Sequence, residues 1–271
     1  MRLPKIYDHF QQGQLFTIDE ARAALNITGN TLRKRLCELS LRGYIKAVRQ
    51  GLYQIAPTEG GTPLQNSSPY SLACKLTPWC YIGFKTALQF YAREHPPEGD
   101  TVFVVSHRKF NPFEHNGLNY FWCQSPDDWG LEKYSSVEGH WQAPIVVTDF
   151  EKTLLDCIKR PMHSPAMHEF IRLCKATGKR PDMEKLFRYA ANPGTTAIFN
   201  RLGFLLDTMA QHWDISETTL KAAEERMSRR QTEWHIPASR GCAREFNDKE
   251  MSNRWHIQFP ENPLDKPLAD C

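Results

Sequence analysis

The first 56 residues carry a succession of hydrophobic patterns that few small folds accommodate. Apolar residues at helical spacing predict amphipathic helices near residues 3–10 and over residues 18–25. A third helix is predicted over residues 30–42, and an alternating stretch over residues 44–55 predicts a hairpin that turns at Gly51. Helix, helix, turn, helix and hairpin, in this order, predict a winged helix-turn-helix.

Local signals set the expected boundaries of these elements. Thr17 and Glu20 have the spacing of a capping box at the start of the second helix, and residues 15–17 fit a short strand before it. Gly43 is placed to end the third helix, because glycine tolerates the left-handed backbone that follows a helix terminus.

The charge of the chain is concentrated in the same segment. The formal net charge is only +3, from 34 Lys/Arg and 31 Asp/Glu. Residues 1–56 hold nine of the basic and four of the acidic residues, so they carry +5 and the remainder carries −2. A basic N-terminal segment points to nucleic acid as its partner.

The third helix is the expected recognition helix of this segment. Leu32, Leu36 and Leu39 would face the core, which leaves the opposite side for the major groove of double-stranded DNA. The predicted DNA contacts are Asn30, Thr31, Arg33, Lys34, Arg35, Arg42, Lys46 and Arg49.

These side chains have different expected roles. Asn30 fits the edge of an adenine, and Arg33 or Lys34 fits guanine or a phosphate. Arg35, Arg42 and Lys46 are expected on phosphates, which position a protein without reading sequence. Arg49, at the tip of the wing, is expected in a minor groove or along the backbone. Winged helices also serve as protein-interaction modules, and that alternative stays open.

The rest of the chain predicts a second, larger domain, so the fold class is α+β. Turn-forming residues 57–69 predict a linker, residues 70–230 a mixed α/β domain, and residues 231–271 an irregular tail that packs near residues 255–259. Strands are expected at 101–105, 120–123 and 144–148, followed by helices at 150–159, 166–177, 182–191, 196–211 and 216–229.

Composition excludes several classes of protein. No apolar run approaches the ~20 residues of a membrane span, and the charged start is unlike a signal peptide. The eight cysteines are scattered, with no C-x-x-C pair, and are expected to be reduced thiols. We therefore expect a soluble, cytoplasmic protein without a membrane partner.

Two constellations raise the possibility of chemistry. Asp149, Glu151 and Lys152 are the residue types of a metal-dependent nuclease. The same segment also reads as a capping box of Thr148 and Glu151 at a strand-to-helix turn, which we favour.

The second constellation comprises His163, His168, Cys157 and Cys174. It lacks the close ligand pair of a zinc site. The sequence also lacks the glycine-rich phosphate loops and the nucleophile elbow that announce common enzymes. We expect no catalytic residue, no metal, no cofactor and no enzymatic activity.

Several segments resemble the AbiEi family of antitoxins. They are RQGLY at 49–53, WCYIGFKTAL at 79–88, TVFVV at 101–105, VTDFEKTLLDCIKRP at 147–161 and RLGFLL at 201–206. Phe150 stands where the family pattern has proline, and Asp207 occupies its acidic position. The resemblance spans about residues 5–230.

The resemblance implies the antitoxin of a type IV toxin–antitoxin system, active in abortive infection and phage defence. Such a protein binds inverted repeats in its own promoter as a transcriptional autorepressor. Its C-terminal domain neutralises a nucleotidyltransferase toxin without a stable complex. A stand-alone regulator with this fold but no toxin gene is the remaining alternative.

Overall fold

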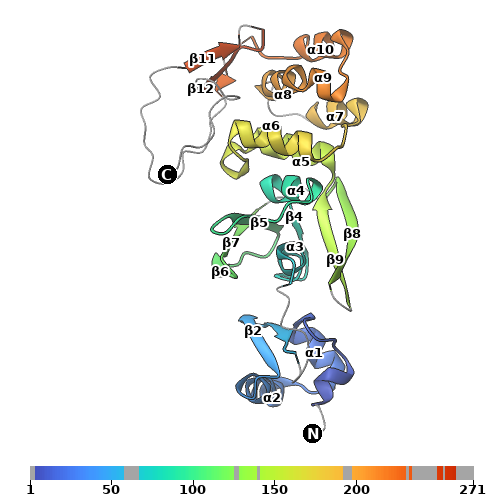
Figure 1. Ribbon diagram of the computed structural model, residues 1–271, viewed down its shortest axis with the longest axis vertical. Helices are drawn as coiled ribbons and strands as arrows, with labels where there is room; N and C mark the ends of the chain where they lie inside the picture. Colours follow the sequence, from blue (N-terminus) through green and yellow to red (C-terminus); the bar gives the residue numbers. More distant parts are fainter. Residues whose placement is uncertain are drawn as a thin grey trace. The chain divides into compact units, whose positions relative to one another are not determined.

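The polypeptide alternates between two structural units (Figure 1). The computed structural model describes residues 4–57, 67–124, 128–138, 141–191, 197–229, 232–233, 249–252 and 254–260. One unit comprises Met1–Ile82 and Pro96–Val147, and the other comprises Gly83–His95 and Thr148–Cys271. The fold combines helices and sheets, as the sequence predicts. The domain boundaries drawn from sequence stay predictions, and most of the expected linker lies outside the described residues.

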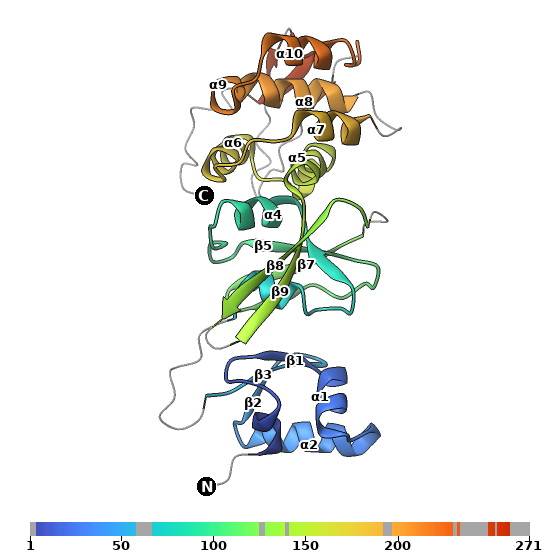
Figure 2. The same ribbon diagram turned by 90° about the vertical axis from the view of Figure 1, so that its right-hand side faces the viewer.

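The first unit begins with a small sheet covered by helices (Figure 2). Its elements are the 3₁₀ helix η1 (Lys5–Asp8), β1 (Leu15–Thr17), α1 (Ile18–Leu25), α2 (Gly29–Leu41), β2 (Ile45–Arg49) and β3 (Leu52–Ile55). The strands pair antiparallel in the order β1-β3-β2. Leu32, Leu36 and Leu39 of α2 share one apolar core with Ile45 and Ile55 of the sheet.

The boundaries predicted for this segment agree closely with the structure, except at its start. The capping box is confirmed: Thr17 accepts a hydrogen bond from the Glu20 amide, and Glu20 accepts one from the Thr17 amide. The helix predicted at residues 3–10 is wrong for its described part, residues 4–10, where only the 3₁₀ turn Lys5–Asp8 forms. No apolar period continues past Phe10. The Tyr7 hydroxyl instead fixes the turn by donating to the carbonyls of Tyr44 and Ala56.

A six-stranded sheet completes the first unit. Its elements are α3 (Pro69–Ala73), β4 (Cys80–Ile82), β5 (Thr101–Ser106), β6 (Phe113–His115), β7 (Leu118–Cys123), β8 (Leu131–Glu138) and β9 (Trp141–Thr148). The strand order is β6-β7-β5-β4-β9-β8. The β4–β5 pair is antiparallel, whereas β5–β7 and β4–β9 are parallel. The three strands predicted here are confirmed, while β4, β6 and β8 were not anticipated.

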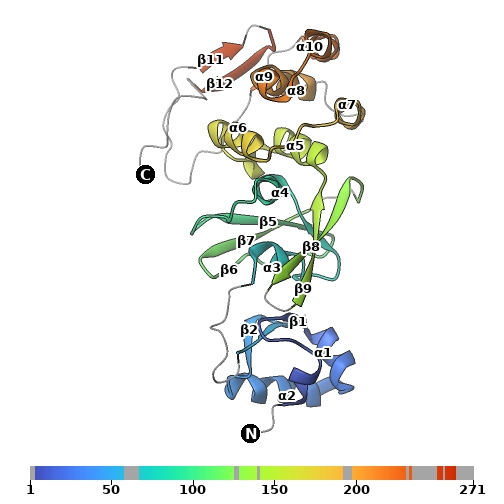
Figure 3. The same ribbon diagram turned by 45° about the vertical axis from the view of Figure 1, so that its right-hand side comes forward.

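The second unit is predominantly helical (Figure 3). Its elements are α4 (Phe84–Tyr91), α5 (Phe150–Lys159), η2 (Pro161–His163), α6 (Met167–Ala176), α7 (Met183–Ala190), α8 (Ala197–Thr208), α9 (Ala210–Trp213), α10 (Glu217–Glu224), β10 (Thr232–Glu233), β11 (Lys249–Ser252) and β12 (Ile257–Pro260). Helix α5 is central and packs against α4, α7 and α8. The five helices predicted here are present, the fourth as the pair α8 and α9.

A tryptophan from the C-terminal segment is seated on α8. Trp255 is fully buried, its Nε1 donates to Asp207 Oδ2 at 2.7 Å, and its carbonyl accepts from Asn200 Nδ2 at 2.9 Å. A Cβ at Gly203 would overlap the six-membered ring of this tryptophan. The expected packing near residues 255–259 is therefore confirmed at Trp255, and Gly203 supplies the space that it needs.

The structure describes six of the eight cysteines. The described cysteines are free thiols, and four of them are buried as small core residues. Among the described residues, no helix combines the length and the apolar character of a membrane span.

Candidate nucleic-acid interface

Helix α2 presents a continuous outward face. Burial of Leu32, Leu36 and Leu39 at a spacing of three and four residues fixes the rotation of the helix about its axis. The exposed stripe opposite them comprises Asn30, Lys34, Cys37 and Leu41, flanked by Thr31, Arg33, Arg35 and Glu38. The rotation of α2 therefore agrees with the prediction.

The cations on this face differ in their partners. Arg35 Nη1 lies 3.1 Å from Glu38 Oε2, an exposed pair one helical turn apart. Within the described part of the chain, Arg33 and Lys34 form no ion pair. Exposed pairs are worth at most about 1 kcal/mol. Arg33 and Lys34 therefore carry the uncompensated charge of α2.

Two further predicted contacts lie on the opposite face of the small sheet. Strand β2 pairs Lys46 with Gln54 and, after a bulge, Arg49 with Leu52. Gln54 and Leu52 share a face of β3, so the bulge brings Arg49 to the same side as Lys46. Tyr53 packs on the helices from the other side. The structure thus separates Lys46 and Arg49 from the exposed stripe of α2.

Arg49 does not project from the turn. Its guanidinium carbon lies 5.2 Å from the ring centroids of both Phe110 and Phe113, which flank the start of β6. Its Nη1 is buried and has no hydrogen-bond partner among the described residues. Burial lowers the pKa of Arg49 below its usual value, and the nearby charge of Arg108 lowers it further.

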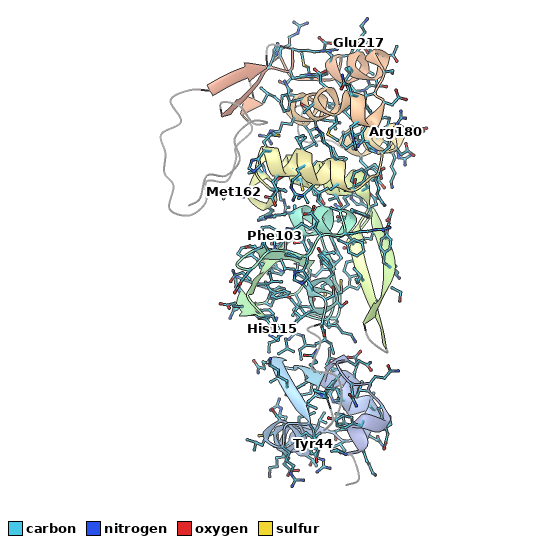
Figure 4. All side chains as sticks on the ribbon, viewed as in Figure 1. Tyr44, Phe103, His115, Met162, Arg180 and Glu217 are labelled. Atoms are coloured by element: carbon cyan, nitrogen blue, oxygen red, sulfur yellow. The ribbon has the colours of Figure 1, made fainter. Side chains whose placement is uncertain are left out.

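A second pair of basic groups, Lys46 and His115, belongs to strands β2 and β6. His115 of β6 is labelled in Figure 4 and is half-buried. Burial lowers the pKa of His115, and the charge of nearby Lys46 adds to this effect. We call Lys46, Arg49, Arg108 and His115 the basic cluster. Sequence reasoning missed Arg108 and His115, because no local pattern indicates that β6 lies beside β2.

The carboxylates of the nuclease alternative are engaged with protein groups. Asp149 is the N-cap of α5: its Oδ1 accepts from the Lys152 amide and its Oδ2 from the Tyr189 hydroxyl at 3.0 Å. Glu151 Oε1 accepts from the Asp182 amide at 2.9 Å. Lys185 Nζ lies 3.2 Å from Asp149 and 2.7 Å from Glu151.

The predicted capping box of Thr148 and Glu151 is therefore wrong. The cap is shifted by one residue, and Glu151 reaches α7 rather than its own helix start. Burial favours a lowered pKa for Lys185, but hydrogen bonds and charge from Glu151 and Asp149 outweigh it and raise the pKa above its usual value. The arrangement joins α5 to α7 as an ion-pair network.

Lys152 and Asp156 of α5 form a further ion pair. Lys152 is 1% exposed, and its Nζ lies 3.1 Å from Asp156 Oδ2. Burial raises the pKa of Asp156 even though Lys152 opposes the shift. Within the described ranges, no group of three His, Cys, Asp or Glu residues is placed to hold a metal ion.

These elements define a mixed α/β protein with a helix-covered small sheet, a six-stranded sheet and a helical unit. No family model and no curated protein matches the chain. A similar fold is present in the crystal structure of the RV2827C protein from Mycobacterium tuberculosis, with a TM-score of 0.58 and 13% identity. The similarity covers 90% of this chain and 85% of that chain. At this identity it establishes the fold alone.

Proposed function

We propose that residues 1–56 form a winged helix-turn-helix that binds double-stranded DNA through α2. The observation that carries this proposal is the exposed stripe of α2, where Asn30, Arg33 and Lys34 lie near the helix N-terminus. Side chains at this end of a recognition helix reach base edges in the major groove. Arg33 and Lys34 have no competing carboxylate in the described residues, so their charge is available to phosphates or guanine.

The biological role that we propose is that of an AbiEi-type antitoxin. The protein would repress its own promoter at inverted repeats and antagonise a nucleotidyltransferase toxin through its larger, C-terminal part, without a stable complex. The sequence segments at 147–161 and 201–206 support this assignment. Residues of these two segments also stabilise the fold, since Asp149 caps α5 and Gly203 leaves room for the Trp255 ring.

We assign no catalytic role to Asp149 and Glu151. Their oxygens accept hydrogen bonds from Lys152, Tyr189 and Asp182 and lie within ion-pair distance of Lys185. A nuclease would need these oxygens for a metal ion, so the engaged carboxylates support a role in holding α5 to α7.

DNA binding is tested by fluorescence anisotropy with the full chain. The probes are a duplex from the protein's own upstream region and a scrambled duplex, each at two or more salt concentrations. We expect selective binding of the upstream duplex, and Lys34→Ala should weaken it. If Lys34 contacts a phosphate, the slope of log affinity against log salt should also fall by about one unit.

Lys175→Ala is the matched control, because Lys175 is an exposed lysine of α6 with no ion pair among the described residues. The control should bind like the unchanged protein. Equal, weak binding to both duplexes that disappears with salt would overturn the repressor proposal.

The antitoxin role is tested by co-expression with the neighbouring nucleotidyltransferase gene. We expect the full chain to restore growth, and Lys34→Ala to restore it as well while losing promoter repression. Failure of the unchanged protein to restore growth, at matched expression, would remove the antitoxin assignment and leave the DNA-binding proposal standing.

A further inference from the structure

We propose that the basic cluster, Lys46, Arg49, Arg108 and His115, is a binding site for a phosphate group. Both contributing segments, β2 and the residues around β6, belong to the first unit. The cluster lies on the face of the small sheet opposite α2, so it is separate from the proposed DNA-reading surface. The inference therefore does not depend on the proposed function.

Arg49 is positioned to donate hydrogen bonds to an incoming anion. Two phenylalanine rings hold its guanidinium, yet its buried Nη1 has no hydrogen-bond partner among the described residues. Aromatic faces stabilise the cation but do not accept the hydrogen bonds that a guanidinium offers in several directions. A buried donor without an acceptor costs roughly as much as a lost hydrogen bond, so the site favours an incoming acceptor.

The charge around Arg49 also favours an anion. Arg108 lies near Arg49, and Lys46 lies near His115, so three cationic side chains and one imidazole gather around β2 and β6. None of the ion pairs among the described residues includes Lys46, Arg49 or Arg108. Glu114 is exposed and, by strand alternation, points to the face of β6 opposite Phe113 and His115. An anion would offset the charge of Lys46, Arg49 and Arg108, and a neutral His115 can still donate its ring N–H to it.

The backbone holds the cluster in place. The bulge in β2 turns Arg49 to the side of Lys46. Beside β6, the Ser106 hydroxyl donates to the Arg108 carbonyl at 2.8 Å, and the Phe113 ring stacks on Tyr120 with centroids 5.0 Å apart. A planar guanidinium held by such supports matches the oxygens of a phosphate, which accept paired N–H donors.

Two sources can supply this phosphate chemistry: inorganic phosphate free in solution, or the backbone of a DNA duplex. The test has one arm for each source and uses the full chain. Arg108→Ala is the test variant, because Arg108 is exposed and its loss removes charge without removing core packing. Arg188→Ala, an exposed arginine of α7, is the matched control.

In the first arm, thermal unfolding is followed in phosphate and in chloride at equal ionic strength. At tenfold excess over a millimolar dissociation constant, phosphate should raise the melting temperature by about 3 °C. The rise should disappear in Arg108→Ala and persist in Arg188→Ala. In the second arm, Arg108→Ala should lower the salt slope of duplex binding by about one unit, which is roughly a fourfold relative change between 50 and 200 mM salt.

The site is supported if Arg108→Ala, but not Arg188→Ala, loses the rise in melting temperature or lowers the salt slope. The arm in which this happens identifies the source of the phosphate group. Equal behaviour of Arg108→Ala and Arg188→Ala in both arms would overturn it. Phe113→Leu gives a second test, because it removes one ring beside Arg49 and keeps all charges. If the two rings position Arg49 for the phosphate, this variant should weaken phosphate binding in the same arm in which Arg108→Ala does. Since the phosphate arm contains no DNA, a failure of the repressor proposal would not affect it.

Discussion

Because Trp255 packs on Gly203 of α8, we predict that Gly203→Ala destabilises the unchanged protein but stabilises a variant that lacks the Trp255 ring. In the unchanged protein, a methyl group at Gly203 would occupy the space of the Trp255 ring. Trp255 is fully buried and donates to a carboxylate, so its displacement costs both packing and a charged hydrogen bond. We expect Gly203→Ala to lower the free energy of unfolding by about 3 kcal/mol.

Trp255→Ala should cost about 3–5 kcal/mol by itself, in the range of large-to-small core substitutions. In that background the obstacle to a side chain at position 203 is gone. Alanine is better than glycine inside a helix by roughly 0.5–1 kcal/mol, so Gly203→Ala should then stabilise the protein. The coupling between the two positions follows from steric overlap, which additivity of independent sites would not produce.

The assay is urea unfolding of the four proteins of this cycle, followed by far-UV circular dichroism. Trp255→Phe is a control that keeps a ring but removes the N–H donor to Asp207, and it should cost less than Trp255→Ala. An equal loss from Gly203→Ala in both backgrounds would refute the steric argument, because the penalty would then arise from the helix itself.

Three shorter predictions concern charge and exposure. Burial alone would raise the pKa of Glu20, but hydrogen bonds and charge from Lys75 lower it below its usual value. Glu20→Gln should therefore lower the free energy of unfolding by up to about 1 kcal/mol at neutral pH, after solvent screening. Chemical denaturation at several pH values should show this cost fading as the pH falls below about 4, where Glu20 becomes protonated. Glu151→Gln should destabilise by about 1–3 kcal/mol in the same assay, since it weakens the bond to Lys185, and an unchanged stability would contradict the network. Leu41 is 83% exposed, so Leu41→Ser should change stability by less than about 0.5 kcal/mol; a larger loss would show that α2 packs differently.

The sequence predicts well those elements whose signals are local. The helix over residues 18–25 was predicted with both boundaries, because Thr17 and Glu20 cap it reciprocally and the apolar period is clear. The helix predicted over residues 30–42 was displaced by one residue, since Gly29 rather than Asn30 begins it. At α5 the cap was assigned one residue early, because Thr148 and Asp149 both suit an N-cap and only the structure shows which one accepts the bond.

Contacts that join distant segments could not be predicted in the same way. Nothing near Arg49 in the sequence indicates that Phe110 and Phe113 flank it, and its basic neighbours made DNA the natural expectation. Likewise, Gly203 and Asp207 belong to a stretch that resembles a family segment, and only the structure shows that Trp255 packs on Gly203 and donates to Asp207. Side chains on one helix face can be deduced from periodicity, whereas partners across a sheet depend on topology.

The interleaving of the two units sets a limit on how this protein can be divided. The segment Gly83–His95 contributes α4 to the helical unit, although the chain before and after it belongs to the other unit. Tyr91 from α4 meets the ring of Phe150 and donates to the Thr148 carbonyl, so it is built into the start of α5. A fragment beginning at residue 148 would lose this support, and one ending at residue 147 would carry α4 without the helices it packs on. To separate the two activities that we propose, DNA binding and toxin antagonism, point substitutions in the intact chain are better than deletions.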